Sequence, residues 1–332
     1  MSLKKSAKNK VKEQTDLKWE NEVAKLKREV ERHRRLAAAA DMRAKEAEQQ
    51  IRDFHNSRFE ISKQKVRKAK SRRAIRRVVF GDTHGCSLDP KAWSAMLQDI
   101  ERLQPSSVIH GGDVLDCDGF LSTHLPMYVA QTSYSYADEI VAANIMFDQL
   151  HEVAPKAEIE VIEGNHDARP ELFCVTQASR HKLDAQFLLD AIGPKQQLNI
   201  EKRGIKWWSR SECHDDAVAG GTIKRDNCYF THPQRIAGKT AARRLLGSFK
   251  KNVVYFHVHH RNYYSDSNIQ GEEWGAWCPG CMCVKRKYWH HSDHFAHNQG
   301  YHLQLVHPDG SFLGINVPII DGKSYLSDLI KL

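Results

Sequence analysis

Five short blocks of polar residues constrain this 332-residue chain most, because each block directly follows an apolar run of the kind that forms a strand. The blocks are Gly81–Gly85, Gly111–Asp113, Gly164–Asp167, Thr231–His232 and His257–His259. Each contributes Asp, Asn or His, the hard-to-borderline ligands that suit divalent transition metals. Two such metals close together can hold a phosphate group and activate a water against it. The pattern therefore indicates a metal site built on strand ends.

Several of these residues can be placed from the sequence pattern alone. Asp82 and His84 lie two residues apart in one loop and can bind one metal from the same side. Asp113 follows the next strand, and its two carboxylate oxygens can bridge two metals; the alternative is a loop cap. His257 and His259 are predicted to point the same way from an extended segment, because side chains two apart on a strand share a face.

The order and identity of the blocks resemble the calcineurin-like metallophosphoesterase superfamily, from about Arg76 to about His260. The resemblance implies an α/β (α+β) fold in which a two-sheet β-sandwich is flanked by helices, with metals at the strand ends. It also implies metal-dependent hydrolysis of phosphoesters. Two positions depart from the family pattern: Phe256 stands where Gly precedes the His-x-His block, and Pro233 follows the preceding His where Gly is frequent.

The resemblance also implies which residues bind which metal. The first metal is expected to bind Asp82, His84, His259 and a bridging Asp113. The second is expected to bind Asp113, Asn165, His232 and His257. Oxygen and nitrogen donors without a thiolate fit Mn, Fe or Zn; we favour Mn, with Fe, Zn or Mg as alternatives.

Three residues of the third block and its surroundings are candidates for other roles. By resemblance, His166 is not a ligand but donates a proton to the leaving oxygen, and Asp167 orients or polarises it. A His suits this role because its unperturbed pKa lies near neutrality. Arg169 is a candidate for binding the substrate phosphate, since a guanidinium matches two phosphate oxygens; the alternative is a surface ion pair. We interpret Asp116 and Asp118 as loop residues or as partners of the ligands.

The chain is predicted to divide into a basic helical arm, residues 1–74, and a catalytic domain, residues 75–332. Residues 1–77 hold 25 Lys and Arg against 11 Asp and Glu, a net charge of +14, whereas the remainder holds 25 against 30, a net charge of −5. Residues 61–77 alone carry nine basic side chains and no acid. Such an arm is expected to bind DNA or another polyanion through its phosphates; the alternative is a solvated helix face.

A seam of apolar and small residues runs along the arm from Trp19 to Phe54 in alternating steps of four and three, the a/d pattern of a coiled coil. Neither Pro nor Gly occurs before Gly81, and good helix formers dominate. Alanines thin the middle of the seam, so a lone helix would be marginal. We favour self-association into a homo-oligomer. The alternatives are packing on the catalytic domain, another protein partner, or a fraying surface helix.

Cys278, Cys281 and Cys283 raise a second metal hypothesis. Their CxxC spacing suggests zinc, which the histidines that follow could complete: His290, His291, His294, His297 and His302. The alternative is a turn into a strand behind the His-x-His block, and phage-encoded members of the superfamily often carry Pro-Gly-Cys-x-Cys there. Eight cysteines are too few for a disulfide scaffold, which favours reduced thiols in a cytoplasm, the host cytoplasm if the protein is phage-encoded.

Three functions remain open on the sequence alone. The basic arm favours a nuclease that acts on DNA. The second reading is a phosphatase or phosphodiesterase for proteins, nucleotides or other small molecules, with the arm used for assembly. The third is a non-catalytic nucleic-acid-binding or structural protein, against which the intact ligand set argues. No apolar run approaches the ~18 to 20 residues of a membrane span, so no membrane partner is expected.

Overall fold

The structure, a computed structural model, describes the backbone of residues 3–61, 74–120, 135–211, 220–236, 238–285 and 297–326; in the first range it describes side chains only from 19 to 49. The chain separates into two compact units, Met1–Lys70 and Ser71–Leu332. Within the described ranges, no helix combines the length and apolar character needed to cross a bilayer.

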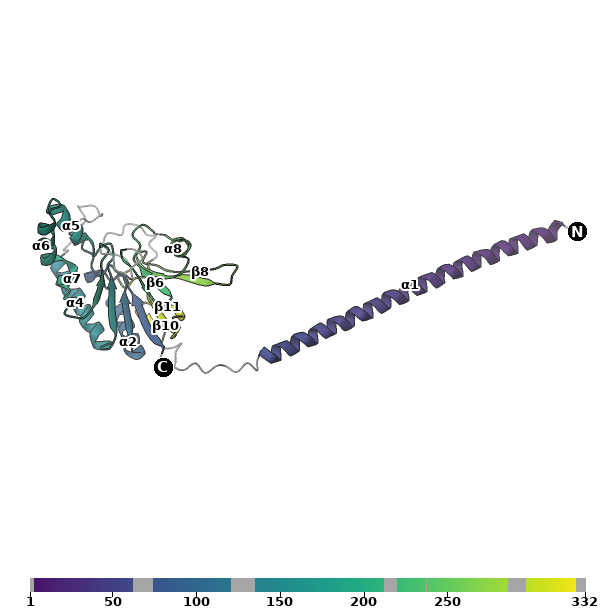
Figure 1. Cartoon of the computed structure of the whole chain (residues 1–332), viewed down its shortest axis with the longest axis horizontal. Helices are drawn as coiled ribbons and strands as arrows, with labels where there is room; N and C mark the ends of the chain where they lie inside the picture. The colour runs from purple at the N-terminus through teal and green to yellow at the C-terminus, as the bar shows by residue number, and fades with distance from the viewer. Residues whose placement is uncertain are drawn as a thin grey trace. The chain divides into compact units, whose positions relative to one another are not determined.

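In the first unit the structure describes one helix, α1 (Leu3–Ile61), which confirms the predicted helical character of the arm (Figure 1). Every described side chain of α1, residues 19–49, is exposed. These include the apolar members of the seam, among them Trp19, Leu26 and Val30. Their burial in a coiled coil therefore stays a prediction, since nothing in the described part of the helix covers them.

Two β-sheets form the centre of the second unit. The larger sheet has seven strands in the order β12-β11-β10-β1-β2-β3-β4, with β1 to β4 parallel to one another. Its strands are β1 (Ile75–Phe80), β2 (Ser107–His110), β3 (Glu158–Ile162), β4 (Lys206–Trp208), β10 (Gln299–Val306), β11 (Phe312–Ile320) and β12 (Lys323–Ser324). The smaller sheet has five strands in the order β5-β6-β7-β9-β8. Its strands are β5 (Thr222–Arg225), β6 (Cys228–Thr231), β7 (Asn252–Tyr255), β8 (Arg261–Ser267) and β9 (Glu273–Pro279).

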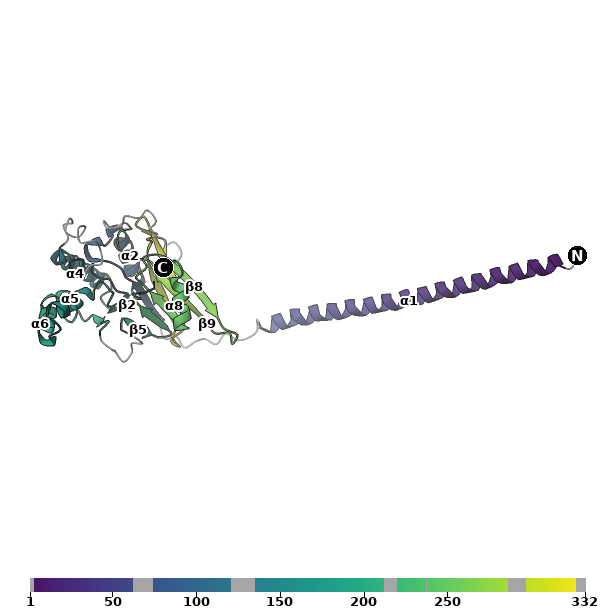
Figure 2. The ribbon, with the colours of Figure 1, turned by 90° about the horizontal axis from the view of Figure 1, so that it is seen from above.

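Helices cover the outer faces of both sheets (Figure 2). The larger sheet is covered by α2 (Pro90–Leu103) and α4 (Tyr136–Val153), whose apolar side chains share one core with it. The smaller sheet is covered by α8 (Ala241–Phe249). The remaining described helices are η1 (Gly85–Ser87), α5 (Arg169–Gln177), α6 (Lys182–Ile192) and α7 (Pro194–Gln197). The predicted two-sheet sandwich flanked by helices is thereby confirmed.

Strand alternation explains why these sequences fold into stacked layers. In β1, Val78 and Phe80 pack in the core under α2 and α4, while Val79 packs between the two sheets. Val108 and Ile109 of β2 divide in the same way. Successive side chains of a strand point to opposite faces, so a run that is apolar throughout must be covered on both sides.

Local sequence signals account for the starts of α2 and α4. α2 begins with Pro90 at its first position, and the Asp89 carboxylate caps it by accepting hydrogen bonds from the amides of Lys91 and Ala92. α4 begins after Ser135, whose side chain accepts a hydrogen bond from the amide of Asp138.

Candidate metal centre

The strand register places the polar blocks at matching heights. In the larger sheet, Phe80 of β1 aligns with His110 of β2, and His110 aligns with Val161 of β3. In the smaller sheet, Thr231 of β6 aligns with Tyr255 of β7. All five strands are parallel to their neighbours in these pairs, so the blocks that follow them leave each sheet at one edge. The loops after these strands hold the candidate site.

The structure brings the predicted ligands together in two groups whose ligand atoms lie within 4.8 Å of one another. The first group is Asp82, His84, Asp113 and His259. The second is Asp113, His232 and His257. Asn165 adjoins the second group, because its Oδ1 lies 3.0 Å from Nε2 of His232. The two groups share Asp113, as the resemblance implies; that they bind metal stays a prediction.

Five of these residues occupy the left-handed region of backbone conformation, which side chains other than glycine rarely adopt. Their φ angles are 53° for Asp82, 55° for His84, 54° for Asp113, 80° for His257 and 56° for His259. The first two loops hold each other, since the amide of His84 donates to the carbonyl of Asp113 at 3.0 Å. Strained backbone of this kind persists where the surrounding structure enforces it, typically at functional sites.

The route by which His257 and His259 reach the site corrects the sequence prediction. β7 ends at Tyr255, so neither histidine lies on an extended strand. Both sit in a turn with positive φ, and they join different groups. The amide of His257 donates to Oδ2 of Asp82 at 3.2 Å, which ties this turn to the first block. The prediction of strand alternation was wrong here, because turn geometry aims the two rings.

Hydrogen bonds fix which nitrogen of two rings is available. Nδ1 of His232 donates to the carbonyl of Gly111 at 2.8 Å, so Nε2 is the nitrogen that faces the second group, 3.2 Å from Oδ2 of Asp113. Nδ1 of His84 lies 2.6 Å from Oδ1 of Asp116, and its Nε2 faces the first group. Metal-binding histidines commonly use their second nitrogen in this way, which sets the ring orientation.

The charge balance shows that both groups suit a cation. Burial raises the pKa of Asp82, but the facing His259 outweighs it and lowers that pKa to about 2. Burial likewise opposes protonation of His259, yet the Asp82 carboxylate raises its pKa to about 10. In the second group, Asp113 overcomes burial and raises the pKa of His232 to about 8. A divalent metal on these nitrogens would replace the protons, so the donors fit the metals that the resemblance implies.

His166 lies beside the first group, with its ring centroid 4.9 Å from that of His84. Its Nδ1 donates to the carbonyl of Asp116 at 2.9 Å, and its Nε2 faces Nη2 of Arg169 at 3.3 Å. Burial lowers the pKa of His166 well below its usual range. The neutral ring is therefore favoured, with its proton on Nδ1.

Arg169 is held by protein groups rather than exposed. Its Nη1 donates at 2.8 Å both to Oδ1 of Asp118 and to the carbonyl of Asp116. The residue is only 8% exposed, so the surface ion pair that we considered is in fact a buried one. Its contact with a substrate phosphate stays a prediction.

The side chain of Asp167 does not make the contact with His166 that the resemblance implies. Its carboxylate accepts hydrogen bonds from the backbone amides of Val114, Leu115 and Gly164, at 3.0 to 3.2 Å. Among the described hydrogen bonds it makes none to His166, whereas the Asp116 carboxylate approaches that ring, with Oδ1 3.6 Å from Nδ1. The expected orienting contact is therefore replaced by a structural one: Asp167 joins the second block to the third.

Two supporting residues were not found from the sequence. Glu139 of α4 is buried, and its two carboxylate oxygens accept from the amides of Asp116 and Cys117 at 3.1 and 3.0 Å. His110 is also buried; its Nε2 lies 3.0 Å from Oγ1 of Thr83 in the first block. An acid on the apolar face of α4 was a signal for Glu139, whereas His110 at a strand end had no distinguishing pattern.

Phe256, one of the two departures from the family pattern, has a clear structural basis. Its buried ring lies against Gly81 and Gly111. A Cβ at Gly111 would come within 2.0 Å of that ring, and a Cβ at Gly81 within 2.8 Å. The glycines are therefore needed because the aromatic ring occupies the space between the two sheets. At these positions, close approach matters more than the turn freedom that glycine also gives.

The structure separates the three cysteines of the segment, and whether any of them binds zinc stays a prediction. Cys278 lies in β9, and its carbonyl accepts a hydrogen bond from Asn316. Metal-capable groups in the described part of the chain include Cys281 and Cys283 but not Cys278. His302 lies in β10 and bonds to Asn316 as well. Of the other histidines, His297 groups with Cys281, whereas His290, His291 and His294 lie outside the described residues.

Comparison with known proteins extends this description. The fold matches zinc-bound Vps29 from Entamoeba histolytica (11% identity, TM-score 0.37, 75% of this chain and 96% of that one). It also matches YfcE, a phosphoesterase from E. coli (14%, 0.31, 73% and 99%). A third match is purple acid phosphatase PPD1 from yellow lupin (15%, 0.35, 77% and 53%). No curated protein matches the sequence.

The sequence model of the calcineurin-like phosphoesterases matches residues 75–281, which include the five blocks, the whole smaller sheet and four of the seven strands of the larger sheet. This family match spans more than half of the chain. This protein therefore belongs to the calcineurin-like phosphoesterases, a family of metal-dependent phosphoester hydrolases.

Proposed function

We propose that this protein is a two-metal phosphodiesterase that cleaves DNA. The observation that carries the proposal is the pair of donor groups sharing Asp113. Oδ2 of Asp113 lies 3.2 Å from Nε2 of His232 and 3.9 Å from Nε2 of His84, so it stands between the groups. Two divalent metals, which we propose to include Mn, would supply Lewis-acid binding of the phosphate and a lowered pKa for water.

His166 is proposed to assist the leaving group. In the neutral ring the proton lies on Nδ1, so donation from Nε2 requires the ring to take up a second proton. The negative charge of a bound phosphate favours that charged form. Arg169 next to Nε2 and the Asp116 carbonyl on Nδ1 keep the ring in one orientation. Orientation of this kind is what general acid catalysis needs from the protein.

His166→Ala is expected to retain the metals and to slow esters with poor leaving groups far more than activated aryl esters. A general acid contributes about 10²- to 10⁴-fold, and an activated leaving group needs little protonation. The measurement compares turnover of the two ester classes, with elemental analysis of the bound metal. Loss of metal in this variant would show that His166 is a ligand instead.

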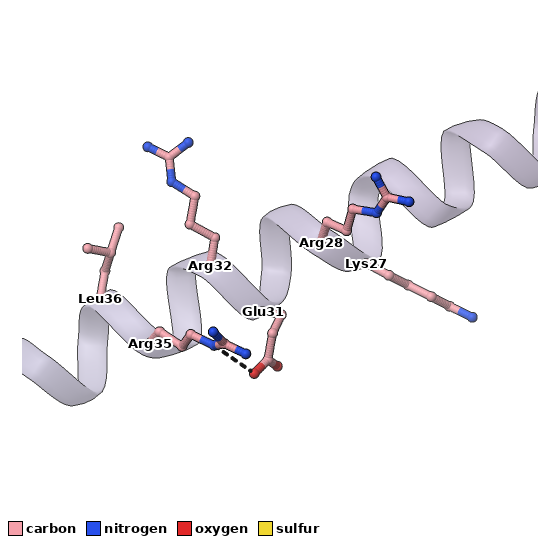
Figure 3. A pocket seen from close by; sticks show the side chains of 6 residues that line it. All are labelled: Lys27, Arg28, Glu31, Arg32, Arg35 and Leu36. Atoms are coloured by element: carbon pink, nitrogen blue, oxygen red, sulfur yellow. Dashed lines mark hydrogen bonds and ion pairs between the residues drawn. The ribbon is translucent and has the colours of Figure 1, made fainter.

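The net positive charge of the arm supports DNA as the substrate. This charge is unevenly distributed along the arm. The described segment 19–49 carries eight Lys or Arg against seven Asp or Glu, so it is nearly balanced. Figure 3 shows a shallow hollow that this helix lines by itself, where Arg35 pairs with Glu31 at 3.4 Å. The net basic charge lies in the segments on either side, above all in residues 61–77. Arg77 belongs to the fold, since its Nη2 binds Asp226 at 2.8 Å.

A second function is hydrolysis of a protein phosphate or a small phosphodiester. It is favoured by the nearly balanced charge of residues 19–49. If the seam of α1 only assembles copies of the chain, its exposed apolar side chains serve that contact and DNA is not involved. Self-association and DNA binding use different parts of the arm, so the two can be tested separately. The sparse cysteines support action in a cytoplasm. The Pro279–Cys283 segment resembles phage-encoded members of the superfamily, for which this would be the host cytoplasm.

Removal of residues 1–74 is expected to leave hydrolysis of a small phosphodiester unchanged and to weaken DNA binding. The cut removes most of the basic excess and spares β1 and every predicted ligand. The lost affinity should be the salt-sensitive part, because log K falls with log salt by about 0.9 per neutralised phosphate of duplex DNA. DNA affinity is measured against salt concentration for both proteins.

Two variants separate the functions of the arm. Changing the basic residues of 63–73 to Gln should reproduce the loss of salt-dependent binding without altering the oligomer. Changing Val23, Leu26 and Val30 to Ser should reduce the oligomer without altering the salt slope, if the seam joins copies. An unchanged salt slope in both the truncated chain and the Gln variant would move the small-molecule function ahead of the nuclease.

A further inference from the structure

Two buried thiols lie beside the first donor group, on the segment that follows β9. The backbone fixes Cys283 from both sides: its amide donates to the carbonyl of Asp82 at 3.1 Å, and its carbonyl accepts from Nε2 of Gln299 at 3.0 Å. It also forms a bridge with Leu88. Cys283 is thus attached to the residue that supplies the first predicted ligand. Its position beside the site is therefore fixed by backbone contacts, although it lies outside the strands of both sheets.

The distances fit coordination by sulfur. Ligand atoms of His84, His259 and Cys283 all lie within 4.8 Å of one another. The Nε2 atoms of the two histidines are 3.1 Å apart. Donors around a tetrahedral zinc, at bond lengths of about 2.0 Å to nitrogen and 2.3 Å to sulfur, lie roughly 3.3 to 3.6 Å from one another. Small shifts on metal binding would therefore bring all three onto one ion.

We propose that Cys283 is a thiolate ligand of the first metal. This inference rests on the two-metal centre proposed above and adds a residue that the ligand pattern of the sequence did not include. On binding, the thiol proton is released to solvent and the sulfur bonds to the metal. Asp82 and Asp113 form the first donor group with the same two histidines, His84 and His259.

A sulfur donor makes the two positions chemically different. Thiolate selects softer ions such as zinc over manganese. The second group contains only oxygen and nitrogen donors, which suit the harder Mn. We therefore expect zinc at the first position and manganese at the second, rather than two ions of one kind.

Cys281 offers the competing arrangement. Its thiol groups with His259 and His297, again within 4.8 Å. The group of Cys281, His259 and His297 shares only His259 with the first donor group, so an ion bound there would lie away from Asp113. The experiment must therefore distinguish the two thiols.

The test uses cobalt(II) as a spectroscopic probe in place of zinc. We expect the full-length protein to show thiolate-to-cobalt charge-transfer absorption as one equivalent is added. Cys283→Ser should lose this absorption, whereas Cys281→Ser and the control Cys86→Ser should keep it. Cys86 is exposed, lies two residues from His84 and belongs to none of the metal-capable groups of the described chain. Absorption that survives in Cys283→Ser, or that disappears only in Cys281→Ser, would overturn the proposal.

A measurement on the unaltered protein protects against a variant that fails to fold. X-ray absorption at the zinc edge should show a sulfur neighbour at about 2.3 Å. A shell of nitrogen and oxygen alone would overturn the assignment of Cys283 while leaving the two-metal centre in place. Protein that binds neither cobalt nor zinc would overturn both. Sulfur ligation in a protein that cleaves no phosphodiester would sink the proposed function and leave this inference standing.

Discussion

Asp113→Asn is expected to abolish hydrolysis of every phosphoester. The carboxylate is the one side chain shared by both donor groups, and the change removes a buried negative charge that faces His232 and His84. The loss should exceed the roughly 10- to 100-fold effect that follows removal of a residue supporting a metal ligand. Turnover of a small phosphodiester and metal content by elemental analysis are the measurements.

Asp321→Asn is the matched control for this change. Asp321 also has a left-handed φ, 50°, but it is exposed and pairs with Lys285 at 3.4 Å. Asn tolerates this backbone conformation as well as Asp does, so neither substitution strains the chain. The control should keep full activity. Normal turnover by Asp113→Asn would contradict a two-metal centre built on Asp113.

The strands and their layers could be predicted because their signal is local. Val78-Val79-Phe80 is apolar at every position, and such a run is stable only between two covering layers. The end of each run was marked by a block that breaks the pattern, so the end of β1 at Phe80 was predictable from composition alone. The pairing of the strands could not be predicted in this way, because nothing local indicates that β10 pairs antiparallel with β1.

The identity of the candidate site residues was predictable, whereas their geometry was not. Asp82, His84 and Asp113 stand out because polar residues follow apolar runs. Their positive φ angles follow from hydrogen bonds between loops that are distant in sequence, and no periodicity reports such contacts. For the same reason, the turn at His257 and His259 was mistaken for the continuation of a strand.

Roles inferred by adjacency were the weakest predictions. Asp167 follows His166 in sequence, yet its carboxylate turns to backbone amides of another block. Asp116 lies far from His166 along the chain but approaches its ring, with Oδ1 3.6 Å from Nδ1. Neighbours in a turn diverge in direction, so sequence proximity to a functional side chain says little about contact. Cys283 illustrates the converse, because a remote segment supplies a donor beside His259.

Gly164→Ala is expected to reduce kcat/KM by about 100-fold or more, although it adds a single methyl group. Gly164 does not have a positive φ, so the backbone itself accepts alanine. A Cβ there would lie 2.1 Å from Oδ1 and 2.2 Å from the backbone N of Asp113, closer than any contact allows. The loop that carries Asp113 must move, and a displacement of about 1 Å at a reacting centre can reduce the rate about 10²-fold. Overpacking should also lower stability, by about 1–3 kcal/mol.

Gly247→Ala separates the steric effect at the site from a general effect of the substitution. Gly247 lies in α8, and a Cβ there meets nothing within 4 Å. This control should be more stable by up to about 1 kcal/mol, since Gly is a poor helix former, and equally active. Thermal unfolding, metal content and kcat/KM are measured for both variants. If Gly164→Ala lost stability but kept its activity, the second and third blocks could move apart without harm, and the position of Asp113 would not control the reaction.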